Sequence, residues 1–199
     1  NKNKILYVGI NIINSNVTII DTEIANSNSE DAINIISSHS YIKNLSMNNI
    51  SADALDIDFG DLVFENITCK NILNDCLDIS GAHIQGKYLE AINVMDKGLS
   101  FGENSVGIIS NVNFIKNKLG IAVKDGSELS LSKYILKKNK YDIAVFNKKE
   151  EYGESILNLN ELENEKNLNI LLGKNNTILS NSNKKITKVK NNYINSLFY

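Results

Sequence analysis

Hydrophobic and polar positions repeat every 22 residues along most of the chain. One column of the repeat is aliphatic, and a second apolar column follows two positions later. The first column contains Ile33, Leu55, Leu77, Leu99, Ile121 and Ile143, and the second contains Ile35, Ile57, Ile79, Phe101, Val123 and Val145. An apolar residue at every second position is typical of a β-strand with one buried face. Six in-phase copies therefore predict a repeat built from strands.

The repeat length predicts the architecture. About 22 residues accommodate three short strands with turns, for example at 62–64, 67–69 and 77–79. The leucine-rich-repeat frame is absent, and residues 5–150 lack a helical apolar stripe. We therefore predict an all-β fold, a right-handed parallel β-helix, with at least six coils between residues 5 and 147.

The regular phase is lost near residue 147, after which shorter apolar runs continue. We assign residues 1–155 to regular coils and residues 156–199 to irregular further rungs and a C-terminal cap of the same domain. The open end of a β-helix exposes unpaired backbone groups, so the apolar segment 197–199 is the expected cap.

Two smaller features follow from the columns. Asn49, Asn71 and Asn93 recur at the repeat spacing, which predicts stacked side-chain amides in tight left-handed turns. Cys69 and Cys76 fall in different parts of a coil, so we expect them to be unpaired, with Cys76 buried as a packing residue.

Composition excludes several function classes. The net charge is −2, so no strongly basic surface points to nucleic acid. No apolar run approaches the roughly 20 residues of a membrane span. The chain begins without an initiator methionine, so we expect it to be an excised part of a larger protein or a processed chain from which any signal peptide has already been removed.

Aspartates form the one concentration of chemically active groups. They occupy successive rungs at Asp53, Asp56, Asp58, Asp75 and Asp78. Alternation with Leu55 and Ile57 places Asp56 and Asp58 on the outer face, with Asp56 stacked about 5 Å from Asp78. Stacked carboxylates repel each other, and hard oxygen ligands favour Ca²⁺. Three readings remain open: a solvated acidic face, a calcium site at Asp56, Asp58 and Asp78, or acid–base catalysis. The cofactor is therefore none or Ca²⁺.

Three acidic or basic runs at 53–56, 75–79 and 97–102 resemble the strand series of polygalacturonase-type pectinases, which are right-handed β-helices of the pectate-lyase-like superfamily. The resemblance matches Asp53 and Asp75 to two catalytic aspartates. It implies the catalytic candidates Asp53, Asp75 and Lys97.

The same comparison shows where the chain departs from that family. Asn74 replaces one aspartate of the catalytic pair, Lys97 replaces the histidine, and the chain has no arginine for the family's basic motif. An inverting hydrolase needs a carboxylic acid and a carboxylate base. We therefore expect no hydrolysis of the polygalacturonase kind.

A longer resemblance covers about residues 28–155. Runs such as Ser-Ala-Asp-Ala-Leu-Asp-Ile-Asp and Asn-Asp-Cys-Leu-Asp-Ile-Ser-Gly are similar to the β-helix regions of bacterial surface or secreted proteins, some of which follow a CotH-like domain. This resemblance implies an extracellular or cell-surface location and a polysaccharide or cell-envelope partner.

The sequence favours a non-catalytic module that binds polysaccharide or serves as a rigid spacer. Its expected ligand-binding residues are Asp53, Asp56, Asp58, Asp75 and Asp78. The alternative is a carbohydrate-active enzyme, a polysaccharide lyase before a glycoside hydrolase, that works from the same aspartates. His39, Asp61 and His83 share one column, which we interpret as a solvent-facing turn rather than a metal site.

Overall fold

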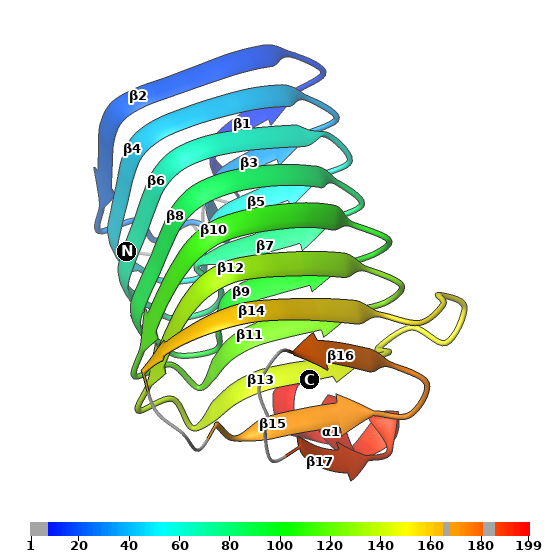
Figure 1. Ribbon diagram of the computed structural model, residues 1–199. Helices are drawn as coiled ribbons and strands as arrows, with labels where there is room; N and C mark the ends of the chain where they lie inside the picture. Colours follow the sequence, from blue (N-terminus) through cyan, green and yellow to red (C-terminus); the bar gives the residue numbers. More distant parts are fainter. Residues whose placement is uncertain (1–7, 165–167, 181–185) are drawn as a thin grey trace, which may run out of the picture.

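The computed structural model describes residues 8–164, 168–180 and 186–199. Over these residues the chain winds through about eight turns of a parallel β-solenoid, with about 22 residues per coil (Figure 1). All strand pairs are parallel, and each strand pairs with the equivalent strand one coil away. The predicted all-β parallel β-helix is confirmed.

The described strands form two sheets, each made of alternate strands. The odd-strand sheet contains β1 (Val8–Ile13), β3 (Asp31–Ile36), β5 (Asp53–Asp58), β7 (Leu77–Ser80), β9 (Lys97–Gly102), β11 (Leu119–Lys124), β13 (Tyr141–Phe146), β15 (Ile170–Gly173) and β17 (Ile186–Val189). The even-strand sheet contains β2 (Asn16–Ala25), β4 (His39–Ile50), β6 (Asp61–Ile72), β8 (His83–Val94), β10 (Val106–Ile115), β12 (Glu128–Lys137), β14 (Ile156–Asn164) and β16 (Thr177–Ser180).

Each regular coil has two strands, where the sequence predicted three. The predicted strands at 62–64 and 67–69 are both parts of the long strand β6, while the third is β7. The long even strands bend midway (Figure 1), and Asn44 in β4 has a positive φ of 54°. Pairing with the neighbouring coil continues on both sides of this bend, so one strand follows two sides of the coil.

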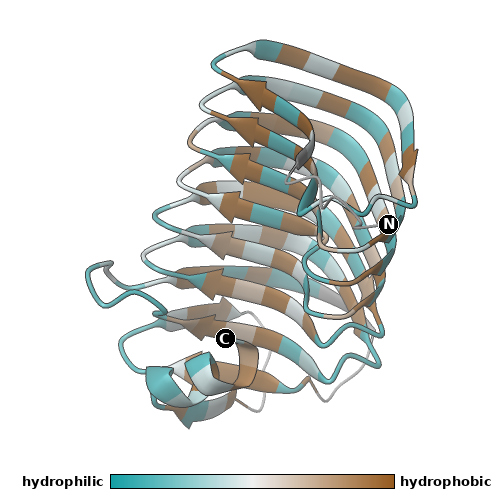
Figure 2. Ribbon diagram, turned by 180° about the vertical axis from the view of Figure 1, so that it is seen from behind, coloured by the Kyte–Doolittle hydropathy of each residue, from teal (hydrophilic) through white to brown (hydrophobic). Residues whose placement is uncertain are grey.

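The two apolar columns of the odd strands point into the coil and form one continuous core with the inner positions of the even strands. Leu55, Leu77 and Leu99 have no exposed surface. Because equivalent residues lie on adjacent hydrogen-bonded strands, each aliphatic side chain packs on the one above it. Figure 2 shows this alternation as brown and teal bands along the strands. The predicted inward facing is confirmed.

The asparagine turn column is confirmed as well. Asn49, Asn71 and Asn93 have φ values of 57°, 56° and 59°, in the left-handed region. The amide of Asn71 donates to the side-chain oxygen of Asn49 at 3.0 Å, and the amide of Asn93 donates to that of Asn71 at 2.8 Å. Asparagine therefore satisfies both the backbone conformation and the stacking at this corner.

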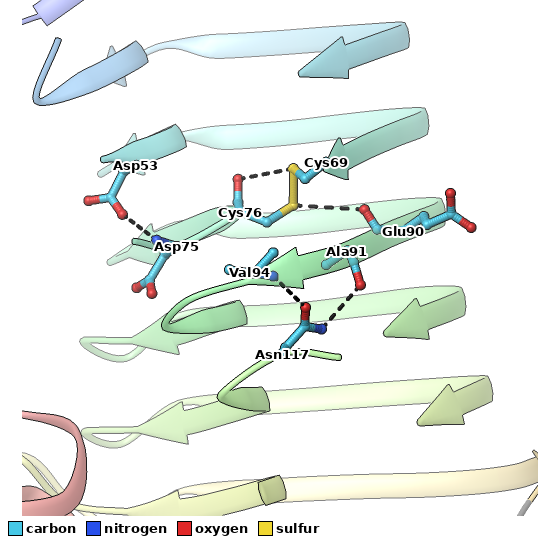
Figure 3. The surroundings of a disulfide bond; sticks show 8 residues. All are labelled: Asp53, Cys69, Asp75, Cys76, Glu90, Ala91, Val94 and Asn117. Atoms are coloured by element: carbon cyan, nitrogen blue, oxygen red, sulfur yellow. Dashed lines mark hydrogen bonds between the residues drawn. A yellow bond between two sulfur atoms is a disulfide. The ribbon is translucent and has the colours of Figure 1, made fainter. Parts of the chain in front are cut away.

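The expectation of unpaired cysteines is wrong. Cys69, near the end of β6, and Cys76, just before β7, form a disulfide (Figure 3). Their columns belong to different sheets, but both face the interior where the sheets approach each other, and their Cα atoms are 5.8 Å apart. That separation suits a disulfide. Both residues are buried, as predicted for Cys76.

The chain ends in helix α1 (Asn191–Phe198), which lies beside the last coils (Figure 1). Its buried residues Ile194 and Phe198 pack with Leu119, Ala122 and Ala144, on the outside of the odd-strand sheet. The segment expected to close the end of the solenoid therefore lies against a side of it. The finding explains a change in the outward column, which passes from Asp78 through Ser100 to Ala122.

Candidate functional site

The catalytic candidates Asp53, Asp75 and Lys97 occupy one column at or just before the starts of β5, β7 and β9. The backbone N–H of Asp75 donates to Oδ1 of Asp53 at 2.7 Å (Figure 3). The backbone N–H of Lys97 donates to Oδ1 of Asp75 at 2.9 Å. Each carboxylate thus accepts a hydrogen bond from a backbone N–H group of the next coil, and these bonds connect three successive coils.

Asp75 and Lys97 form a buried ion pair. Only 3% of Asp75 and 2% of Lys97 is exposed, and Nζ of Lys97 lies 3.4 Å from both Oδ1 and Oδ2 of Asp75. The same ammonium contacts Oδ2 of Asp96, whose other oxygen is 3.0 Å from Nζ of Lys118. The ring of Tyr199 lies over it, with its centroid 4.8 Å from Nζ.

Burial controls the electrostatics of this pair. Desolvation raises the pKa of Asp75 to about 8, although Lys97 acts in the opposite direction. Desolvation alone would lower the pKa of Lys97, but the charges of Asp75, Tyr199 and Asp96 raise it above its usual range. Neither side chain has the exposed surface that attack on a polymeric substrate requires. The position of the pair therefore favours a structural role over glycan chemistry.

The outward aspartates lie as predicted on neighbouring rungs. Asp56 pairs with Asp78 in the register of β5 and β7, while Asp58 pairs with Ser80. All three side chains are half-buried. Burial, followed by the charges of Asp58 and Asp78, raises the pKa of Asp56 to about 8.

Other aspartates of this face are shifted in the same direction. Burial raises the pKa of Asp53 to about 7, against the hydrogen bond from the backbone of Asp75. Burial also raises the pKa of Asp31 and Asp58. The face therefore carries a mixture of carboxylic acids and carboxylates near neutral pH.

Asp31, Asp53, Asp56, Asp58 and Asp78 together form what we call the acidic face. Lys124, on the strand two coils beyond Asp78, lies at the end of this face. Nζ of Lys124 donates to Oγ of Ser100 at 2.8 Å and lies 3.9 Å from Oδ1 of Asp78. The lysine stem crosses Gly102, where a Cβ would lie 2.7 Å from Cε of Lys124. Glycine at this position gives the lysine room to reach the aspartate.

The calcium site predicted at Asp56, Asp58 and Asp78 stays a prediction. Oδ1 of Asp78 is buried without a hydrogen-bond partner, and its ion-pair partner Lys124 lies 3.9 Å away. Within the part of the chain that the structure describes, however, no three His, Cys, Asp or Glu side chains converge as metal ligands. Oxygen ligands for Ca²⁺ would have to come partly from water or from movement of these side chains.

A second candidate site lies on the outer face of the even-strand sheet and was missed from the sequence. A hollow of about 780 Å³ runs across β4, β6, β8 and β10. Its middle column consists of Tyr41, Val63, Gln85 and Ile108, which are neighbours in the strand register. Val63 is 43% exposed and Ile108 is 56% exposed. We call this hollow the groove.

Paired polar groups line both sides of the groove. On one side, Glu65 accepts a hydrogen bond from the hydroxyl of Tyr41 at 2.9 Å and another from Nζ of Lys87 at 3.3 Å. On the other side, Asp61 contacts Nδ1 of His39 and lies 3.3 Å from Nδ1 of His83. The histidines are exposed, as expected for a solvent-facing column. The groove thus combines an apolar floor with polar edges, one formed by the Glu65–Lys87 ion pair and the other by Asp61 between two histidines.

A signal for the groove was present in the sequence. On β6 and β10 the outward positions of Val63 and Ile108 carry apolar residues, although outward positions facing water usually carry polar ones. Alternation alone could not identify this, because the long strands bend and their inward phase changes near the bend. Once the register is known, the exposed apolar column is evident.

This chain matches no family model, no curated protein and no solved structure. The β-helix is therefore supported by the structure alone, and nothing in the comparisons confirms the pectate-lyase-like or the CotH-like assignment. In the described part of the chain, no helix is long and apolar enough to cross a membrane.

Proposed function

We propose that this chain is an extracellular or cell-surface β-helix module that binds a neutral polysaccharide in the groove without cleaving it. The observation that carries the proposal is the combination of an apolar floor, formed by Val63 and Ile108, with hydrogen-bonding groups on Tyr41 and Gln85. A sugar ring has an apolar face and a rim of hydroxyl groups. A groove of this composition matches both.

Charge favours a neutral glycan. Lys87 is paired with Glu65, and both histidines contact Asp61. The groove therefore offers no unpaired cation that could bind an acidic sugar. The acidic face on the other sheet would repel a polyanion. These features favour neutral chains over uronate polymers.

The disulfide supports the location. Disulfides persist in oxidising compartments and are rare in reducing ones. The Cys69–Cys76 bond is buried beneath the coil surface, away from external thiols. An extracellular module would keep this bond without further protection.

The experiment is a binding assay with a panel of neutral and acidic polysaccharides, by affinity electrophoresis followed by calorimetry. Tyr41→Ala combined with Ile108→Ser should weaken binding at least about tenfold, because the first removes a hydrogen-bonding group and the second an apolar floor contact. Tyr193→Ala is the matched control, since Tyr193 is a 51% exposed tyrosine on α1 outside the groove. Equal affinity in the double variant and the control would refute the groove as the binding site.

A carbohydrate-active enzyme working from the acidic face is the second candidate. It is favoured by the raised pKa values of Asp53 and Asp56, which provide acid and base forms together near neutral pH. Incubation with polygalacturonate, alginate and chondroitin in the presence of calcium tests it. Unsaturated products would establish a lyase, and new reducing ends without unsaturation would establish a hydrolase.

A further inference from the structure

We propose that Lys97 and Asp75 condense spontaneously to an amide, so that an isopeptide bond joins two adjacent coils. The motivation is the buried arrangement of three groups: the Lys97 amine, the Asp75 carboxyl and the neighbouring Asp96 carboxylate. The proposal goes beyond glycan binding and does not depend on it.

The geometry places the amine beside the two oxygens of the carboxyl group. Nζ of Lys97 is 3.4 Å from both oxygens of Asp75, so it faces the carboxyl group symmetrically. Attack at the carboxyl carbon needs Nζ and Cγ within about 3–3.5 Å, which requires a small shift of Nζ from the two oxygens onto the face of the carboxyl group. The two residues are fixed by the strand register and by the hydrogen bond between the Lys97 backbone and Asp75, so little motion is needed.

The backbone also supports the developing charge. The N–H of Lys97 donates to Oδ1 of Asp75 at 2.9 Å. This donor is positioned to stabilise Oδ1 when attack at the carboxyl carbon places negative charge there. Oδ2 is then the oxygen that leaves.

Asp96 supplies the base. Its Oδ2 contacts Nζ of Lys97, and its Oδ1 is 3.0 Å from the ammonium of Lys118. Asp96 takes one proton from the Lys97 ammonium and thereby frees the nitrogen lone pair. Although Lys97 holds its proton strongly, a reaction that occurs once in the life of the molecule needs only a small population of free amine.

The step balances without a further reactant. The Lys97 nitrogen forms a bond to Cγ of the protonated form of Asp75, which burial makes accessible near neutral pH. A second proton passes from the nitrogen to Oδ2, the bond between Cγ and Oδ2 breaks, and one water leaves. Asp96 retains the first proton and releases it to solvent through its partly exposed edge.

The surroundings favour the amide once it forms. Asp75 and Lys97 are almost completely buried, and the Tyr199 ring lies over the lysine nitrogen. Little water can therefore return to hydrolyse the bond. The amide is neutral, so condensation also removes the buried positive charge of Lys97, whose desolvation is costly.

Intact mass spectrometry of the reduced, denatured full chain tests the proposal. We expect a mass lower than that of the sequence by one water, and a fragment in which the peptides containing Asp75 and Lys97 are joined. Lys97→Arg keeps the positive charge but should restore the full mass, as should Asp96→Asn, which removes the base. Lys124→Arg, which alters another buried lysine of the same face, should keep the deficit.

Each contrary outcome is distinct. Full mass in wild-type protein that shows a cooperative melt would overturn the proposal, whatever the variants do. A deficit that persists in Lys97→Arg, or a fragment that joins Lys97 to Asp96, would assign the lost water elsewhere and overturn it equally. If Lys97→Arg fails to fold, the wild-type mass and its fragment still decide.

Discussion

The two halves of the odd-strand sheet share one backbone ladder but have opposite outer faces. Around β5 and β7 the outward residues are aspartates such as Asp56 and Asp78, half-buried and open to water on one side. Around β11 and β13 the same column holds Ala122 and Ala144, which are fully buried under α1. The inward columns are equally apolar in both halves. The apolar core is therefore common to both halves of the fold. The outward residues differ because water covers one half and α1 covers the other.

The largest effect on stability is expected from placing a charged side chain at an inward position of one coil. Leu77→Asp places a carboxylate in a fully buried apolar stack without a partner, so cooperative folding should be lost. Asp78→Leu, its outward neighbour, should fold. Thermal melts followed by circular dichroism compare the two. A Leu77→Asp protein that melts within a degree or two of wild type would contradict the inward facing.

The next effect concerns the covered half. Phe198→Ala removes a ring that packs on the outer cluster and contacts Tyr141 edge-on, with centroids 5.4 Å apart. The loss should be about 3 kcal/mol in the free energy of unfolding. Urea denaturation measures it, with Tyr193→Ala on the exposed side of α1 expected to cost less than about 0.5 kcal/mol. Equal losses in the two variants would mean that α1 does not dock through Phe198.

The open half should give the protein an unusual pH dependence. Folding raises the pKa of Asp56 from 3.8 to about 8 and that of Asp53 to about 7. The folded state therefore holds these protons more tightly than the unfolded state does. Stability should be greatest below about pH 4 for these groups and should fall as the pH rises to about 8.

Asp56→Asn tests this dependence because it removes one titrating group and keeps the side-chain shape. Its melting temperature should vary less between pH 5 and pH 8 than that of the wild type, and it should exceed the wild type at pH 8 by a few degrees, about 3 °C. Asp21→Asn, at an exposed position of β2, is the control. Parallel pH curves for all three proteins would remove the acidic face as the cause.

The smallest expected effect is that of calcium. If Ca²⁺ binds at Oδ1 of Asp78, which accepts no hydrogen bond, millimolar calcium should raise the melting temperature by about 1–2 °C through linkage. Asp78→Asn should cancel that increase. An unchanged melting temperature in wild type would leave the acidic face as a solvated surface.

The sequence predicted the repeated parts of this molecule and missed the parts that do not repeat. The core columns, the asparagine turns and the outward aspartates follow from a 22-residue period, because stacking repeats every local choice. The Cys69–Cys76 bond has no counterpart in other coils. Neither has the contact between Tyr199 and Lys97, which lie far apart in the chain.

The candidate sites show the same limit. The aspartates could be predicted because they occupy repeat positions. Their burial could not be predicted, because it depends on residues from other coils such as Lys124. The groove was missed because an exposed Ile108 looks like any other isoleucine until the strand register is known. The alanines at 122 and 144 were a usable signal, since small apolar outward residues indicate a covered surface.

Mapping glycan-induced shifts of methyl and aromatic resonances by nuclear magnetic resonance tests the central claim most directly, because it reports where a polysaccharide binds. The account predicts that a neutral oligosaccharide shifts Tyr41, Val63 and Ile108 on the even-strand sheet and leaves Ile57 and Ile79 beneath the acidic face unchanged. Shifts confined to Ile57 and Ile79, or no shift at any of these residues at millimolar glycan, would contradict it.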